Sequence, residues 1–108
     1  MDLFRKREQL APVEAAPGAV RRTMAVGDRT LLVEWQMQKG ASIPLHQHEH
    51  EQIGYLVSGS IDMTVGEETR RLGPGDGYVA PSGLAHGALA HEDSRIVDVF
   101  SPVREDYR

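Results

Sequence analysis

Residues 40–52 read GASIPLHQHEHEQ and hold three of the five histidines of the chain within five positions. His46 and His48 are two residues apart, so on a β-strand their side chains point to the same face. Neutral imidazole is a common ligand of Zn, Ni, Cu and Fe. Two imidazoles on one face therefore favour a metal site; the alternative is a polar loop in solvent.

A second stretch, residues 75–86, reads GDGYVAPSGLAH and ends in a further histidine. Fixed spacings connect it to the first stretch. Gly40 precedes His46 by six residues, Gln52 follows His48 by four, and Gly59 follows Gln52 by seven. Fifteen residues then separate Gly59 from Gly75.

These two stretches together resemble the two motifs of the cupin family, G-x5-H-x-H-x3-E-x6-G and G-x5-P-x-G-x2-H-x3-N. Gln52 stands where the first motif has Glu, and Ala90 where the second has Asn. The resemblance covers residues 40–90. It implies an all-β, single-domain cupin, a double-stranded β-helix or jelly-roll barrel, with one divalent transition metal in its mouth. The implied metal ligands are His46, His48, Gln52 and His86.

Gln52 changes the charge of the implied site, because a neutral amide replaces a carboxylate. A divalent ion held by three imidazoles and one amide keeps its full positive charge. We expect such a site to favour Lewis-acid chemistry over iron redox chemistry and to attract anionic ligands. In a second interpretation, Gln52 makes a nearby hydrogen bond without touching metal. The metal stays open among Zn, Ni, Mn and Fe, and His50 and His91 are predicted to lie at the surface.

Short alternating segments between turn signals predict about eight antiparallel strands and hence a sandwich or barrel. Glycine supplies 11 of the 108 residues, mostly at the predicted joints. We expect a tail or short arm over residues 1–18 and a cupin barrel over residues 19–108. Three apolar rows mark the strands: Leu31, Val33, Trp35 and Met37; Ile53, Tyr55 and Val57; Ile61, Met63 and Val65.

The composition excludes several classes of protein. A formal net charge of −4 without a basic stripe argues against nucleic-acid binding. The absence of cysteine excludes disulfides and thiolate metal sites. No apolar run is long enough to span a bilayer, and the first residues lack the apolar stretch of a secretory signal. We therefore expect a cytoplasmic protein with no membrane partner.

The last fourteen residues, 95–108, place a carboxylate in an apolar strand. Asp98 alternates with Ile96 and Phe100, so it shares their face. Either that face is in solvent, or Asp98 lies in a pocket where it could act as a general acid or base. The alternation alone leaves both possibilities open.

The ending D-x-F-S-P-x-R-E-D-Y resembles the tail of the KdgF group of cupins, sugar-opening enzymes of pectin and alginate breakdown. The resemblance implies conversion of a 4,5-unsaturated monouronate to its linear ketonised form. It implies catalytic roles for Asp98 and Arg104 and substrate contacts by Phe100 and Arg104. Arg104 offers a planar fork that suits a carboxylate; the alternative is a surface salt bridge with its acidic neighbours. Tyr55 and Tyr78 are further candidates to line the mouth.

Two other functions compete with this one. A metal-dependent cupin dioxygenase would use the same ligands with iron, and a non-catalytic cupin would bind a small anionic metabolite. Exposed edge strands also give a reason to expect a homodimer.

Overall fold

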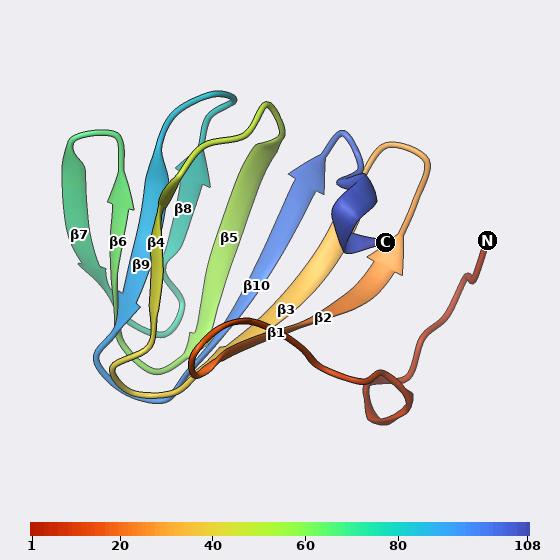
Figure 1. Ribbon diagram of the computed structural model, residues 1–108, viewed down its shortest axis with the longest axis horizontal. Helices are drawn as coiled ribbons and strands as arrows, with labels where there is room; N and C mark the ends of the chain where they lie inside the picture. Colours follow the sequence, from red (N-terminus) through yellow and green to blue (C-terminus); the bar gives the residue numbers. More distant parts are fainter.

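Ten strands form two antiparallel sheets that face each other in the computed structural model, which describes residues 1–108 (Figure 1). The all-β, two-sheet architecture predicted from the alternation is confirmed. The six-stranded sheet has the order β1 (Val13–Ala16), β2 (Ala19–Val26), β3 (Leu31–Met37), β10 (Ser94–Ser101), β5 (Glu51–Ser58) and β8 (Gly77–Ala80). The four-stranded sheet has the order β4 (Ser42–His46), β9 (His86–Ala90), β6 (Ile61–Val65) and β7 (Glu68–Leu72).

The core lies between the sheets and comes from the inner faces of the central strands. The predicted row on β3 and the row on β6 supply much of it, and β10 adds Ile96 and Phe100. Phe100 is 1% exposed. Because β10 lies between β3 and β5, its inward residues reach the middle of the barrel. The candidate functional residues of this strand, Asp98 and Phe100, lie at this position.

The apolar row of β5 faces outward rather than into the core. Ile53, Tyr55 and Val57 are 47%, 52% and 42% exposed. The inward face of the same strand carries Gln52, Gly54 and Leu56, of which only Leu56 is a large apolar residue. The strand therefore alternates as expected, but its polar and small residues are the ones that face the interior.

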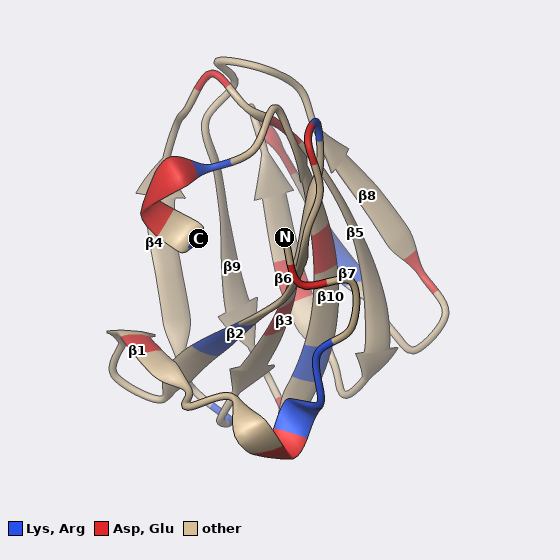
Figure 2. Cartoon of the chain, turned by 90° about the vertical axis from the view of Figure 1, so that its right-hand side faces the viewer, with Lys and Arg blue, Asp and Glu red and all other residues tan.

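The first residues pack along the outside of the six-stranded sheet (Figure 2). Arg7, in the 3-10 turn Arg7–Gln9, donates to Glu34 of β3 at 2.7 Å. Arg22 of β2 donates to the carbonyl of Leu10 at 3.1 Å. β1 pairs with β2, so regular β structure begins before residue 19. The chain has no helix with the length and apolar character needed to cross a membrane.

Candidate metal centre and active site

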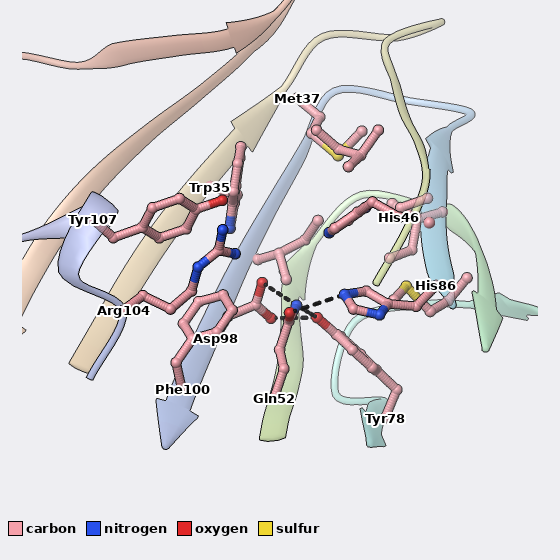
Figure 3. A pocket seen from close by; sticks show the side chains of 16 residues that line it. Trp35, Met37, His46, Gln52, Tyr78, His86, Asp98, Phe100, Arg104 and Tyr107 are labelled. Carbon is pink, nitrogen blue, oxygen red and sulfur yellow. Dashed lines mark hydrogen bonds between the residues drawn. The ribbon is translucent and has the colours of Figure 1, made fainter. Parts of the chain in front are cut away.

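Three histidines, His46, His48 and His86, lie close together beside a pocket between the two sheets. His46 and His86 line that pocket directly (Figure 3). His46 ends β4 and pairs directly with His86, which begins β9. His48 lies beyond the end of β4, so the predicted strand geometry does not hold for it. The turn nevertheless directs its ring back to the others, and one nitrogen from each ring lies within 4.8 Å of the other two.

The main chain fixes the tautomer of each imidazole. In all three rings Nδ1 lies against a carbonyl oxygen, to which it donates: His46 to Pro44 at 2.9 Å, His48 to His50 at 2.9 Å, and His86 to Leu84 at 3.0 Å. The proton on Nδ1 leaves Nε2 with a free lone pair. Burial lowers the pKa of His48 and of His86 and so favours their neutral forms. Such back-bonded, neutral rings are typical of metal-ligating histidines.

Gln52 completes a set of converging lone pairs. Its Oε1 lies 3.2 Å from Nε2 of His48 and 3.2 Å from Nε2 of His86. Since the histidine protons are on Nδ1, no proton is available between these atoms. Lone pairs that face one another without a proton between them repel, and a cation placed among them would remove that repulsion. The four residues His46, His48, Gln52 and His86 therefore fit a divalent metal with nitrogen and oxygen ligands.

The other end of the Gln52 side chain contacts two acidic groups. Its Nε2 donates to the Tyr78 hydroxyl at 2.6 Å and to Asp98 Oδ2 at 3.1 Å. The Tyr78 hydroxyl in turn donates to Asp98 Oδ1 at 2.6 Å. Because the amide nitrogen donates to the Tyr78 hydroxyl and to Asp98, the amide oxygen points the other way, at the histidines. The amide thus connects the possible metal site to Asp98.

Asp98 lies inside the pocket, which resolves the question that the alternation left open. The residue is 3% exposed and sits on the inner face of β10. Burial raises the pKa of its carboxyl from 3.8 to about 7, while the hydrogen bonds from Tyr78 and Gln52 act in the opposite direction. A pKa close to neutrality suits a group that both takes up and releases a proton.

The burial of Asp98 predicts how the stability of the metal-free protein depends on pH. Its folded-state pKa lies above the ordinary value, so its contribution is complete below about pH 4 and is lost as the pH rises through about 7. Between about pH 5 and about pH 8 the free energy of unfolding should fall by roughly 3 kcal/mol from this group. Urea unfolding of the protein and of Asp98→Asn should show the fall only in the former. Parallel pH profiles would contradict the assignment.

The C-terminal turn Glu105–Tyr107 lies over one side of the pocket. Arg104 just before it is largely buried, and its guanidinium carbon lies 3.8 Å from the Tyr107 ring centroid and 5.2 Å from that of Phe100. Arg104 also pairs with Asp106 at 2.9 Å. Arg104 thus makes the local salt bridge and also lines the pocket, and a contact with a substrate carboxylate stays a prediction.

The two tyrosines predicted to line the mouth, Tyr55 and Tyr78, differ in their positions. Tyr78 lines the pocket, but its hydroxyl is engaged with Gln52 and Asp98 rather than free for a ligand. The prediction that Tyr55 lines the mouth is wrong, because the alternation of β5 turns it to the outside. His91 lies outside the histidine cluster and contacts Asp62 at 2.8 Å. His50 accepts a hydrogen bond from His48 through its carbonyl, and its ring, predicted to lie at the surface, is partly buried and packs against that of His48 with 5.6 Å between the centroids.

Tyr107 is a pocket residue that the sequence analysis missed. Its ring packs between two guanidinium groups, Arg104 at 3.8 Å and Arg21 at 4.0 Å from the centroid. Burial raises the pKa of its phenol, so Tyr107 is a neutral wall of the pocket. The signal that could have found it is an aromatic residue at the end of a tail that already carried Phe100 and Arg104.

A β-sandwich with a histidine cluster between its sheets defines a cupin, and the chain belongs to this family. The family profile described as Cupin domain matches residues 33–100. The chain is 34% identical over 96 residues to the pectin degradation protein KdgF of Dickeya dadantii, with 87% of each chain covered. It is also similar to the solved structure of KdgF from Halomonas sp., with a TM-score of 0.93, 38% identity and full coverage of both chains.

A further solved structure, an RmlC-like cupin from Shewanella frigidimarina, has a TM-score of 0.94 and 29% identity. It covers 100% of this chain and 97% of that one. The likeness therefore extends over the whole fold, including the N-terminal arm and the C-terminal turn.

Proposed function

We propose that this protein is a metal-dependent enzyme that converts 4,5-unsaturated monouronates, from pectin or alginate breakdown, into linear ketonised sugars. The observation that carries the proposal is the buried Asp98, hydrogen-bonded to the amide that faces the histidine cluster. The similarity to the pectin degradation protein KdgF supports the same chemistry. Arg104 on the other side of the pocket supplies a cation for an acidic sugar.

His46, His48, Gln52 and His86 would hold the metal. Because all four are neutral, a divalent ion keeps its full charge, and the chemistry it supplies is polarisation of a sugar oxygen as a Lewis acid. The same positive charge favours an anionic substrate in the pocket. Imidazole nitrogen and amide oxygen accept Zn, Ni, Mn and Fe, and the donor set alone does not choose among them.

Arg104 binds the uronate carboxylate in this proposal. Its guanidinium is held by Asp106 on one side and stacks on Tyr107 and Phe100 on the other. These contacts reduce the freedom that the long side chain would lose on binding. Phe100 and Tyr107 form the apolar walls against which a flat, unsaturated ring can lie.

Asp98 moves the proton that the reaction requires. Opening the ring breaks the bond between the anomeric carbon and the ring oxygen, and the anomeric hydroxyl loses its proton to become an aldehyde. The former ring oxygen becomes the oxygen of an enol. The enol turns into a ketone when the double-bonded carbon that does not carry this oxygen gains a proton. The reaction is an isomerisation that adds and removes no atoms. A carboxyl that takes up and releases one proton at neutral pH can accept the proton of the anomeric hydroxyl and deliver a proton to the enol carbon.

The test is the ultraviolet absorbance of the conjugated uronate, followed with and without the metal-loaded protein. We expect faster loss of the signal with protein, no acceleration after chelation, and a higher KM for Arg104→Lys, which keeps the charge but loses the fork. No acceleration with any of several unsaturated uronates would contradict the function. Oxygen consumption that depends on the uronate would instead indicate a dioxygenase, and binding without turnover a non-catalytic cupin.

We also infer that two copies associate through the outer face of the six-stranded sheet. β5 and β8 expose Ile53, Tyr55, Val57 and Val79 there, while the arm that covers the neighbouring strands exposes Leu3 and Phe4 at 77% and 92%. A twofold axis lets the arm of each copy cover the bare strands of the other.

The mass in solution tests this association. Light scattering should give the mass of two chains, and Tyr55→Arg should reduce it to one. Leu89→Arg is the matched control, because Leu89 is 40% exposed on the other sheet. A monomeric wild type, or a Tyr55→Arg variant that stays dimeric, would contradict the interface.

A further inference from the structure

Tyr78, Gly54 and Asp98 are neighbours on three adjacent strands. Gly54 of β5 pairs with Tyr78 of β8 on one side and with Asp98 of β10 on the other. A Cβ atom at Gly54 would lie 2.1 Å from Cε1 of Tyr78 and 2.3 Å from Oδ1 of Asp98. Because Gly54 has no side chain, the Tyr78 hydroxyl reaches the Asp98 carboxylate across it. The glycine therefore makes room for a contact between strands that do not pair with each other.

Gln52, Tyr78 and Asp98 close a triangle of hydrogen bonds beneath the histidines. Gln52 Nε2 donates to both partners, at 2.6 Å and 3.1 Å, and Tyr78 donates to Asp98 at 2.6 Å. Both protons of the amide and both oxygens of the carboxylate are used. The triangle therefore holds the amide oxygen toward the histidines through contacts that involve no metal.

A carboxylate at position 52 would break this triangle. It has no proton to donate, and its oxygen would take the place of an amide nitrogen that stands 3.1 Å from Asp98 Oδ2. Two buried carboxylates at that separation repel each other strongly. The glutamate of the cupin motif would therefore be repelled by Asp98 at this site unless one of the two acids took up a proton.

We propose that Gln52 and Asp98 are a matched pair, in which the buried carboxylate at position 98 dictates the amide at position 52. Gln52 is a positioning residue for Asp98 as well as a candidate ligand. The pair is reciprocal: exchanging the amide and the carboxylate between the two positions restores one donor and one acceptor. The inference concerns the folded, metal-free chain, so it stands or fails independently of turnover of any uronate.

The experiment is a double-mutant cycle on the metal-free protein at neutral pH, read as the thermal unfolding midpoint. Gln52→Glu should lower the midpoint by roughly 5 to 10 °C. Asp98→Asn should also lower it, because an amide nitrogen then replaces one of the two oxygens that accept hydrogen bonds from Gln52 and Tyr78. The double variant Gln52→Glu/Asp98→Asn should recover at least half of the loss seen in Gln52→Glu. Co²⁺ titration should show that the double variant still binds the ion, since its new carboxylate is itself a ligand.

Gln36→Glu is the matched control for the substitution. Gln36 accepts a hydrogen bond from Arg22 at 2.8 Å, and a carboxylate can accept the same bond. It should leave the midpoint unchanged. The pairing is overturned if Gln52→Glu has the same unfolding midpoint as the wild type. It is also overturned if the double variant fails to fold, or if its midpoint falls by at least the sum of the decreases in the two single variants. A double variant that folds where Gln52→Glu alone does not would support it.

Discussion

Asp98→Asn is expected to reduce kcat on an unsaturated uronate by about 100- to 10,000-fold, the range that general acid–base groups contribute. The substitution keeps the shape of the side chain but removes its ability to exchange a proton near neutral pH. The Asp98 carboxyl is the one buried acid that lines the pocket, where its pKa is raised to about 7. Steady-state kinetics with metal-loaded protein measures the effect.

Metal content must be checked in the same preparation, because Asp98 contacts a candidate ligand. Asp62→Asn serves as the matched control, since Asp62 pairs with Arg71 and His91 away from the pocket. That variant should turn over at the wild-type rate. If Asp98→Asn retained full metal and kept its rate within about twofold, Asp98 would have no acid–base role.

His86→Ala is expected to weaken metal binding by at least about 100-fold, beyond the 10- to 100-fold typical of groups that only orient ligands. His86 is 2% exposed, lies opposite His46 in the register and brings its Nε2 to the Gln52 oxygen. Its loss removes one of the convergent lone pairs and opens a hole in the centre of the site. Equilibrium dialysis with Zn²⁺ or Ni²⁺ gives the affinity, and uronate turnover should disappear with it.

His91→Ala is the matched control for this prediction. His91 contacts Asp62 at 2.8 Å and lies outside the cluster, so its removal should leave the metal affinity unchanged. Chelation of the wild type should have the same effect on turnover as His86→Ala, and returning the metal should restore it. Full metal content in His86→Ala would contradict the assignment of these ligands.

The histidine cluster could be predicted from the sequence because its members lie at fixed spacings around turns. Gly40, Gly59 and Gly75 mark where the strands turn, and the histidines stand at constant distances from them. Nothing in the spacing, however, predicted the hydrogen bonds that orient the rings. These depend on carbonyl groups, such as that of Pro44, whose direction is a property of the folded chain.

The alternation on β5 and β10 showed which residues share a face but not which face is buried. On β5 the outward row is more apolar than the inward one, so Tyr55 was misplaced. On β10 the same pattern left Asp98 undecided. Both outcomes have one origin: the pocket places polar residues on the inner faces of these strands, and the outer face of β5 carries apolar residues.

Tyr107 was missed because the last residues have no periodicity, and only the composition of the tail pointed to it. The turn Glu105–Tyr107 is three residues long and is held by contacts distant in sequence, such as that of the Tyr107 ring with Arg21 of β2. Such contacts arise only when the C-terminus folds back over the barrel. Sequence patterns within a strand carry no information about them.

The carbonyl groups behind the three imidazoles have a consequence for which ions the pocket accepts. A hydrogen bond to a main-chain carbonyl already orients each ring in the folded chain. The side chains therefore lose their rotamer entropy during folding and not when an ion binds. This loss costs about 0.5 to 1.5 kcal/mol per side chain. The donors thus form a rigid template of fixed size. If the site takes up a metal as proposed, we expect ions whose preferred bond lengths or coordination geometry do not match that template to bind more weakly.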